Sequence, residues 1–211
     1  MLILGLTGSI AMGKSTMAMQ FHQEGIPVHD ADQAVHDLMA VGGAATAEVA
    51  SLFPEAQNPD GSIDRPTLGR LVFNNGEARQ QLEGILHPLV RQNRDDWLKS
   101  HEDDGAWCVA LDVPLLFETG GEKDCDATVV ATTSPYQQRI RALSRPGMTP
   151  DRLDAILELQ MPDKMKRDQA DFVIPTSYGR LVSLFYIRQC LEQCRLFGTS
   201  FKREQPSMKT H

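Results

Sequence analysis

Long apolar runs are missing from this sequence of 211 residues. The longest are far shorter than the ~20 residues that a membrane-spanning helix requires. The chain enters an apolar stretch directly at Leu2–Leu6, without the basic segment that opens a signal peptide. We therefore expect no membrane association and no export, and we predict a cytoplasmic location.

An excess of basic residues is also missing. Lys and Arg together number 21 against 28 Asp and Glu, which gives a net charge of −7. Nucleic acids and anionic membrane surfaces are held by basic faces, so we expect neither as a partner. An anionic ligand must instead be bound by a few donors placed at one site.

Cysteine is scarce, with four residues and no paired framework, and we expect all four to remain reduced. Cys190 and Cys194 stand at helical i, i+4 spacing. No histidine or second cysteine pair accompanies them, so packing in a core is a better interpretation than half of a metal site.

The first thirty residues predict a βαβ unit. Leu2–Thr7 is a short, continuous apolar run, typical of a strand buried on both faces. Lys14–Gln23 has helical spacing, and a turn with Gly and Pro separates it from a second strand at Val28–Asp30.

Three further apolar runs predict the remaining strands of a five-stranded parallel sheet. They are Trp107–Val113, Thr128–Thr132 and Phe172–Ile174. With helices between them, the expected fold is α/β with three layers. The length and the 41% apolar content suit a single domain over 1–211 with insertions.

The first insertion covers 33–105 and is predicted to be helical, since it is too long for one crossover helix. Its helical patterns are Thr46–Phe53, Thr67–Phe73 and Arg79–Leu98. Asn58–Gly61 predicts a turn. Pro88 predicts that the last pattern is two helices that meet at His87, because proline is favoured in a first helical turn.

The second insertion covers 134–168. Ser134 and Thr149 each precede a proline and are expected to be N-caps. A closing helix is predicted over Tyr178–Phe197, and the polar tail 198–211 is expected to be disordered. The residues of this helix that we expect in the core are Leu181, Leu184, Phe185, Leu191 and Phe197.

One motif decides the class of protein. Residues 8–15 read Gly-Ser-Ile-Ala-Met-Gly-Lys-Ser, which matches the P-loop pattern and stands between a predicted strand and a predicted helix. In such a loop the backbone N–H groups surround a β-phosphate, Lys14 adds a mobile charge, and Ser15 supplies a ligand for Mg²⁺. A glycine-rich turn without a ligand is a much less probable explanation.

Three kinds of P-loop protein compete. A GTPase needs an [NT]-K-x-D string and a D-x-x-G switch, and neither occurs. A transport or motor ATPase would bring a further signature element that we do not find. A small-molecule kinase needs an acceptor pocket, a nearby base and a cationic lid, and the two insertions offer places for them.

Acidic residues follow two of the predicted strands, where parallel sheets bind ligands. Asp30 and Asp32 share a side after the second strand, and one of them would accept the acceptor's proton. Asp32 has an alternative role as N-cap of a helix that begins at Gln33. Asp112 has the placement of a carboxylate that helps to orient Mg²⁺, or it is a strand-end acid without a catalytic task. A metal cluster of His29 and His36 with these carboxylates is a poor signal.

These motifs together resemble the dephospho-CoA kinases over about residues 2–195. The P-loop alone indicates a superfamily, whereas the further motifs are close to diagnostic. In order they are Gly5-Leu6-Thr7-Gly8 through Thr16, Asp30-Ala31-Asp32, Asp64-Arg65, His87-Pro88, Pro114-Leu115-Leu116-Phe117-Glu118, Arg141 and Arg145, Gln160, and Ala170-Asp171.

The resemblance implies ATP-dependent phosphorylation of the ribose 3′-hydroxyl of dephospho-coenzyme A, the last step of coenzyme A synthesis. It makes Asp32 the general base and Lys14 a catalytic cation. The P-loop residues Gly8, Ala11, Met12, Gly13, Lys14, Ser15 and Thr16, with Arg141 and Arg145 from the lid, would bind ATP. The residues near the acceptor would be Thr7, Asp32, Arg65, His87, Leu115 and Glu118, and the metal ligands Ser15 and Asp112.

Several alternatives remain open at this point. Arg65 and the lid arginines are also explained as solvated charges, and His87 as a helix-boundary residue. Ala11 stands where the family often has Gly, which we expect to restrict the backbone only slightly. Thr176 stands where the family often has Asn near the adenine. A kinase of another small alcohol or nucleotide, or a non-catalytic nucleotide-dependent switch, is the alternative function.

Overall fold

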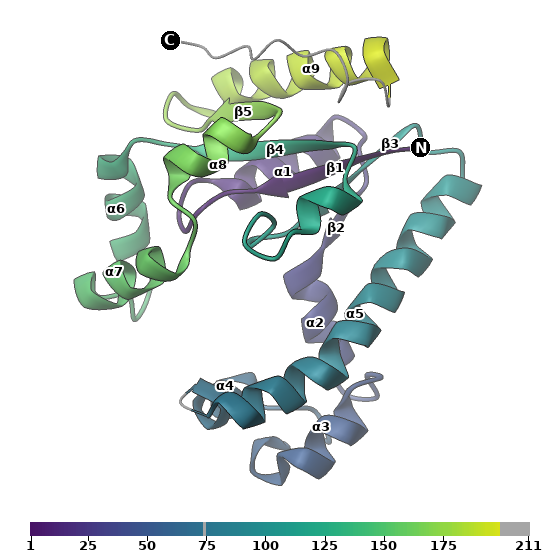
Figure 1. Cartoon of the computed structure of the whole chain (residues 1–211), viewed down its shortest axis with the longest axis vertical. Helices are drawn as coiled ribbons and strands as arrows, with labels where there is room; N and C mark the ends of the chain where they lie inside the picture. Colours follow the sequence, from purple (N-terminus) through teal and green to yellow (C-terminus); the bar gives the residue numbers. More distant parts are fainter. Residues whose placement is uncertain (74, 199–211) are drawn as a thin grey trace. The chain divides into compact units, whose positions relative to one another are not determined.

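The computed structural model describes residues 1–73 and 75–198, which form two compact units (Figure 1). The first unit contains Met1–Val28 and the chain from Asp104 onward, and the second contains His29–Asp103. The tail predicted over 198–211 lies outside the described residues, apart from Gly198. None of the helices in the described ranges has the length and apolarity of a membrane-spanning segment.

The predicted five-stranded parallel sheet is confirmed. The strands lie in the order β2-β3-β1-β4-β5. Strand β1 pairs in parallel with β3 and β4, and β4 pairs in parallel with β5. The strands are β1 (Leu2–Thr7), β2 (Val28–Asp30), β3 (Cys108–Asp112), β4 (Ala127–Thr132) and β5 (Phe172–Pro175).

Helices cover one face of the sheet with apolar side chains. Leu2, Leu4 and Leu6 alternate along β1 and join one buried cluster with residues of α1 (Lys14–Gln23) and α9 (Arg180–Phe197), and Figure 1 shows α9 lying along the sheet. On the opposite face the chain approaches β1 very closely. A Cβ at Gly5 would lie 2.7 Å from Cδ2 of Leu116 and 2.8 Å from Sγ of Cys125, so a larger residue here would require these side chains to shift.

The buried face of α9 differs from our prediction. Its buried residues are Ser183, Ile187, Cys190, Leu191 and Cys194, which share one stripe of the helix. Of the residues expected in the core, only Leu191 is buried and Leu184 is half-buried. The remaining three are exposed: Leu181 (83%), Phe185 (57%) and Phe197 (49%).

Three of the four cysteines, Cys108, Cys190 and Cys194, lie in this core. All four are free and buried. Among the described residues no group of three or more His, Cys, Asp or Glu side chains is arranged to hold a metal ion. The packing interpretation of Cys190 and Cys194 is confirmed because both lie in the buried cluster with residues of β1 and α1.

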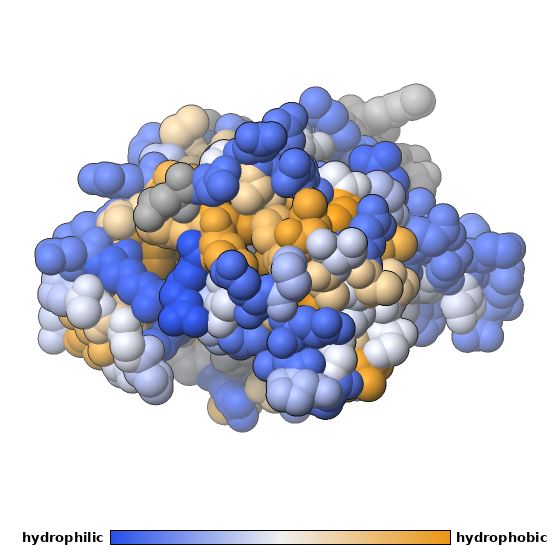
Figure 2. Space-filling model, turned by 90° about the horizontal axis from the view of Figure 1, so that it is seen from below, coloured by the Kyte–Doolittle hydropathy of each residue, from blue (hydrophilic) through white to orange (hydrophobic). Residues whose placement is uncertain are grey.

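The second unit consists of helices around a core of its own. Its helices are α2 (Ala31–Leu38), α3 (Thr46–Leu52), α4 (Arg65–Phe73) and α5 (Gly76–Asp103), with a 3-10 turn η1 at Pro54–Ala56. The turn predicted at Asn58–Gly61 is present, with the Gly61 N–H donating to the Asn58 carbonyl over 2.9 Å. Figure 2 shows orange, hydrophobic areas among the blue, hydrophilic residues of the surface. The exposed large apolar side chains of this unit are Val41, Leu52 and Phe73.

The prediction of two helices meeting at His87 is wrong. Helix α5 continues through Pro88. Both sides of the proline contribute to one core, with Ile85 and Leu86 before it and Leu89 and Val90 after it packing against the same cluster. His87 and Pro88 are exposed, so water can solvate the carbonyl that the proline cannot satisfy.

The second insertion forms α6 (Pro135–Leu143), α7 (Pro150–Leu159) and α8 (Asp163–Gln169). Both predicted N-caps are confirmed. The Ser134 hydroxyl accepts from the Gln137 N–H, and the Thr149 hydroxyl accepts from the Arg152 N–H, each over 3.2 Å. Helices α6 and α7 pack against each other and against the P-loop through a small apolar cluster that contains Ala11.

Candidate active site

The P-loop joins β1 to α1 and turns sharply twice. Gly13 has φ 96°, and Ala11 has φ 60°, the one positive φ among the described non-glycine residues. A left-handed conformation costs an L-residue roughly 1–2 kcal/mol, so the restriction at Ala11 is larger than the slight one that we expected. Its methyl group is buried against Ala142 of α6 and Leu153 of α7, and this apolar contact offsets the cost.

Lys14 and Asp112 form a close ion pair at the centre of the first unit's site. Lys14 Nζ lies 2.5 Å from Asp112 Oδ1, and the aspartate side chain is 5% exposed. The pair joins the first residue of α1 to the last residue of β3. A largely buried carboxylate at this strand end has the placement that we predicted for the residue that orients Mg²⁺.

The oxygen donors in this place suit Mg²⁺ when it arrives with a nucleotide. Ser15 directly follows Lys14 in the chain and is exposed in the first turn of α1. Magnesium takes one or two protein ligands together with phosphate oxygens and waters, so a hydroxyl and a carboxylate are a sufficient set.

The loop that follows Asp112 is fixed by three different elements. The Thr7 hydroxyl donates to the Pro114 carbonyl over 3.0 Å, and the Met161 N–H donates to Glu118 Oε1 over 2.8 Å. The same carboxylate oxygen lies 2.8 Å from Lys166 Nζ. Glu118 therefore supports the loop internally, and the acceptor-side place of Glu118 stays a prediction. Leu115, by contrast, is 41% exposed.

Lys166 and the Gln160 contact are the features that the sequence analysis missed. Lys166 is fully buried, although its helix α8 reads as a charged, solvated segment. Gln160 Oε1 accepts from the Ile10 N–H of the P-loop over 2.9 Å. Gln160 was part of the family resemblance, but nothing in the sequence pattern distinguished Lys166 from its exposed neighbours.

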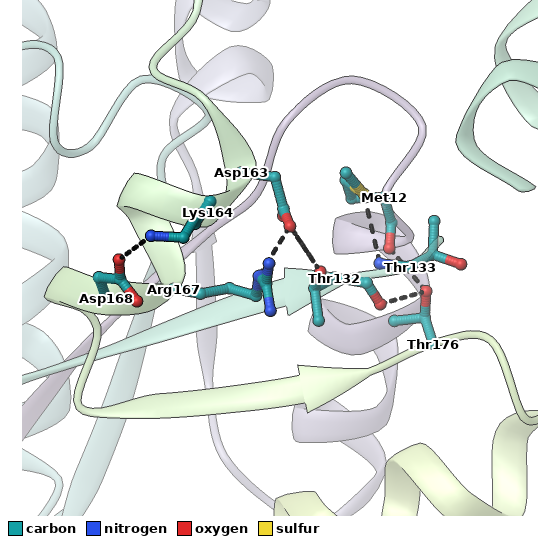
Figure 3. A network of polar contacts seen from close by, with 8 residues as sticks. All are labelled: Met12, Thr132, Thr133, Asp163, Lys164, Arg167, Asp168 and Thr176. Atoms are coloured by element: carbon teal, nitrogen blue, oxygen red, sulfur yellow. Dashed lines mark hydrogen bonds and ion pairs between the residues drawn. The ribbon is translucent and has the colours of Figure 1, made fainter. Parts of the chain in front are cut away.

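Arg141 and Arg145 have different environments. Arg141 donates to the Thr176 hydroxyl over 3.0 Å and to its carbonyl over 2.8 Å. Thr176 in turn donates to the Met12 carbonyl over 2.7 Å, as Figure 3 shows. Arg145 is exposed, and within residues 1–73 and 75–198 its guanidinium has no hydrogen-bond or ion-pair partner.

Figure 3 also shows how the start of α8 is attached to the end of β4. The Thr132 hydroxyl donates to Asp163 Oδ2 over 3.0 Å, and Arg167 Nε donates to the same oxygen over 2.9 Å. The Thr133 N–H approaches the Met12 sulfur at 3.3 Å. The P-loop, the end of β4 and the loop after β5 are thus linked around Met12 and Thr176.

The remaining predicted residues lie in the second unit. Asp30, and not Asp32, is the N-cap of α2, because its Oδ1 accepts from the N–H groups of Asp32 and Gln33 over 2.9 and 3.0 Å. Our alternative role for Asp32 as the cap is therefore wrong. Asp32 is exposed in the first turn, and Arg65 and His87 are exposed on α4 and α5.

His29 has a structural environment in the second unit. It is buried, its Nε2 lies 3.0 Å from Asn93 Oδ1, and its ring packs edge-on against Trp97 at 5.3 Å. These contacts attach the end of β2, directly before Asp30, to helix α5.

Comparison with solved structures supports the fold. A structure from Thermus thermophilus described as TT1252 superposes with a TM-score of 0.80 at 33% identity, over 91% of this chain and 96% of that one. A dephospho-CoA kinase from Campylobacter jejuni gives 0.63 at 23% identity, over 90% of this chain and 96% of that one. A shikimate kinase from Bacteroides thetaiotaomicron gives 0.50 at 16% identity, over 92% of this chain and 98% of that one. The last two show likeness of fold alone, and the fold is that of a P-loop kinase.

Comparison of sequences is more specific. A curated dephospho-CoA kinase from Rhodopseudomonas palustris strain HaA2 is 49% identical over 192 residues, covering 91% of this chain and 95% of that protein. One from Paramagnetospirillum magneticum is 52% identical over 167 residues, covering 79% and 78%. The family model for dephospho-CoA kinase matches residues 2–179. The chain therefore belongs to the dephospho-CoA kinase family.

Proposed function

We propose that this chain transfers the γ-phosphoryl group of ATP to the ribose 3′-hydroxyl of dephospho-coenzyme A, the last step of coenzyme A synthesis. One observation carries the proposal: the P-loop of a chain in this family presents Lys14 paired with the strand-end carboxylate Asp112 at 2.5 Å. This pairing is the arrangement needed to bind a nucleotide's phosphates next to a metal ion.

The P-loop supplies the electrostatic part of the reaction. The backbone N–H groups at the start of α1 and the Lys14 ammonium bind the β- and γ-phosphates, since helix N-termini favour negative charge. On binding, Lys14 exchanges part of its contact with Asp112 for phosphate oxygens. Ser15 and Asp112 would hold Mg²⁺, which supplies positive charge against the phosphate oxygens when bound.

Asp32 is the general base in this proposal. It is exposed, and Asp30 already fills the capping role, so the Asp32 carboxylate is left to accept a proton from the acceptor hydroxyl. Thr7, Arg65, His87, Leu115 and Glu118 are proposed to lie near the acceptor. Phosphoryl transfer needs little covalent work from a protein, so positioning and cations supply most of the rate.

The lid arginines complete the proposed charge distribution. Arg145 is exposed without a partner in the described part of the chain, so its guanidinium is available for the transferring phosphates. Arg141 is attached to Thr176, which favours a role in holding the loop after β5 beside the P-loop. The cytoplasmic location remains our prediction.

An ADP-release assay over a panel of acceptors tests the proposal. The panel contains dephospho-CoA, AMP, adenosine and shikimate, each at the same concentration with ATP and Mg²⁺. We expect strong turnover with dephospho-CoA. Strong turnover only with one of the other three would replace the acceptor, and nucleotide binding without turnover of any acceptor would favour a nucleotide-dependent switch.

A further inference from the structure

Lys166 is an unusual residue because its charged side chain is completely buried. Its relative exposure is 0%, while Lys164 on the same helix has a side chain that is 81% exposed. Removing an ammonium group from water costs several kcal/mol unless close partners compensate. The partners that compensate the buried ammonium group therefore indicate the role of Lys166.

Within the described residues, both partners of the Lys166 ammonium group lie in the loop that follows β3. Its Nζ lies 2.8 Å from Glu118 Oε1 and donates to the Pro114 carbonyl over 3.4 Å. The Thr7 hydroxyl at the end of β1 donates to that same carbonyl over 3.0 Å. Lys166 thus fixes both ends of the segment 114–118, which begins two residues after the aspartate that pairs with Lys14.

The junction between α7 and α8 binds the same carboxylate and the P-loop together. The Met161 N–H donates to Glu118 Oε1 over 2.8 Å, and the preceding side chain, Gln160, accepts from the Ile10 N–H over 2.9 Å. Two consecutive residues therefore hold the P-loop and the 114–118 segment at once. Lys166 supplies the positive charge that keeps Glu118 in this place.

Within the described residues, Lys166 is the one cation that pairs with Glu118, and the Met161 N–H is its further hydrogen-bond donor. Its second oxygen, Oε2, is buried there without a hydrogen-bond partner. A buried carboxylate that loses its cation is strongly disfavoured, so it must turn toward water and take its loop with it. The Lys166 ammonium group therefore supplies the charge compensation for a contact that holds the 114–118 segment beside the P-loop.

We propose that Lys166 is a positioning residue for phosphoryl transfer, which holds the 114–118 segment in register with the P-loop through Glu118, Pro114 and the Gln160–Met161 junction. This inference rests on the proposed kinase function. Lys166 is buried, and its ammonium group contacts Glu118 and Pro114. Its effect belongs to the geometry of the reacting groups, for which a displacement of about 1 Å can cost on the order of 10²-fold in rate.

The central test is Lys166→Met, which keeps the length of the side chain and removes the charge. We expect kcat to fall by about 10–100-fold, with the Kd for ATP changed less than about twofold, because the P-loop itself remains. Lys164→Met is the matched control, since it removes an exposed charge from the same helix, and its kcat should equal that of the wild type.

A second control separates positioning from general loss of stability. Ile187→Ala truncates a fully buried side chain of α9 in the same unit and should lower the melting temperature while leaving kcat within about twofold of the wild type. All rates are compared well below each variant's melting temperature. A wild-type kcat for Lys166→Met, or an equal loss of kcat in Ile187→Ala, would overturn the proposal.

Hydrogen exchange gives a readout that needs no acceptor. In Lys166→Met the amides of Ile10 and Met161 should exchange at least about tenfold faster, whereas Lys164→Met leaves them unchanged. Unchanged exchange in Lys166→Met overturns the positioning role even if turnover with dephospho-CoA fails in the wild type, so the two failures are distinguishable. Should Lys166→Met not fold, Glu118→Gln removes the charge from the other side of the pair and must reproduce the faster exchange.

Discussion

Two carboxylates two residues apart have different tasks at the residue scale. Asp30 caps α2 through the N–H groups of Asp32 and Gln33, and Asp32 is exposed in the first turn. A cap holds its oxygen against backbone donors and is poorly placed to accept a substrate proton at the same time. Asp32, which has no capping role, is therefore the residue that we propose as the base.

Asp32→Asn tests this assignment. The change removes the negative charge and the proton affinity but leaves the cap at Asp30 untouched. We expect the melting temperature and the Kd for both substrates to stay close to the wild type, while kcat falls by a factor on the order of 10²–10⁴.

Asp30→Asn is the matched control, because asparagine also caps helices well. It should keep both stability and rate. A large loss of kcat for Asp30→Asn with a mild one for Asp32→Asn would move the base to Asp30, and wild-type rates in both would remove the general base from the mechanism.

The two lid arginines are the next feature, at the scale of secondary-structure elements. Arg145 is free in the described part of the chain, whereas Arg141 joins α6 to the loop after β5. Arg145→Ala should therefore lower kcat by about 10-fold or more without changing the melting curve, because it deletes only charge offered to the transition state. Arg141→Ala should lower ATP affinity and melting temperature together. Steady-state kinetics gives kcat and calorimetry gives the melting temperature of both variants. If Arg145→Ala alone lowers the melting temperature, Arg145 is the structural residue of the two and our assignment is wrong.

Helix α5 contains Pro88 in its interior, which removes one backbone hydrogen bond. Pro88→Ala should raise the free energy of unfolding by about 1–3 kcal/mol, measured by urea denaturation. The control is Gly84→Ala, an exposed position on the same helix with open space around it, which should add about 1 kcal/mol by propensity alone. Loss of stability in Pro88→Ala would mean that the proline fits this helix better than its missing hydrogen bond indicates.

The local patterns predicted most of these elements, and the errors share a physical cause. The strands and α1 were predictable because buried parallel strands are continuous apolar runs and the P-loop fixes the start of its helix. The continuous helix at Pro88 and the buried face of α9 were not predictable, since tertiary packing outweighed local preference. A shared core continues α5 through Pro88. The stripe of α9 that is buried contains the cysteines and excludes Leu181 and Phe185. The ion pair of Lys166 was equally hidden, because nothing local distinguishes a buried lysine from a solvated one.

Buried thiols connect stability to pH at the scale of the whole molecule. Burial raises the pKa of Cys108 to about 12, with smaller contributions from Cys194 and Asp126, and burial also raises the pKa of Cys190. The unfolded thiol has a pKa of about 8.5. Because the folded pKa is the higher one, the thiol's contribution is fully present below about pH 8.5 and is lost as the pH rises toward 12.

The free energy of unfolding should therefore fall in this alkaline range, and part of the fall belongs to Cys108. The free energy of unfolding of Cys108→Ala is compared with that of the wild type by urea denaturation. The difference between the two free energies should be constant between pH 7 and 8 and should be smaller at pH 10.5. A difference that is the same at pH 8 and pH 10.5 would contradict the raised pKa.

The central claim is that this chain phosphorylates dephospho-CoA, and label transfer tests it most directly. Purified protein is incubated with dephospho-CoA, Mg²⁺ and ATP labelled at the γ-phosphate, and the product is isolated and digested to locate the label. We predict that the label appears on the ribose 3′-oxygen of coenzyme A, with one ADP formed per label transferred, and that Lys14→Ala forms none. Label that is found only in inorganic phosphate, or on another acceptor while dephospho-CoA stays unlabelled, would contradict the claim.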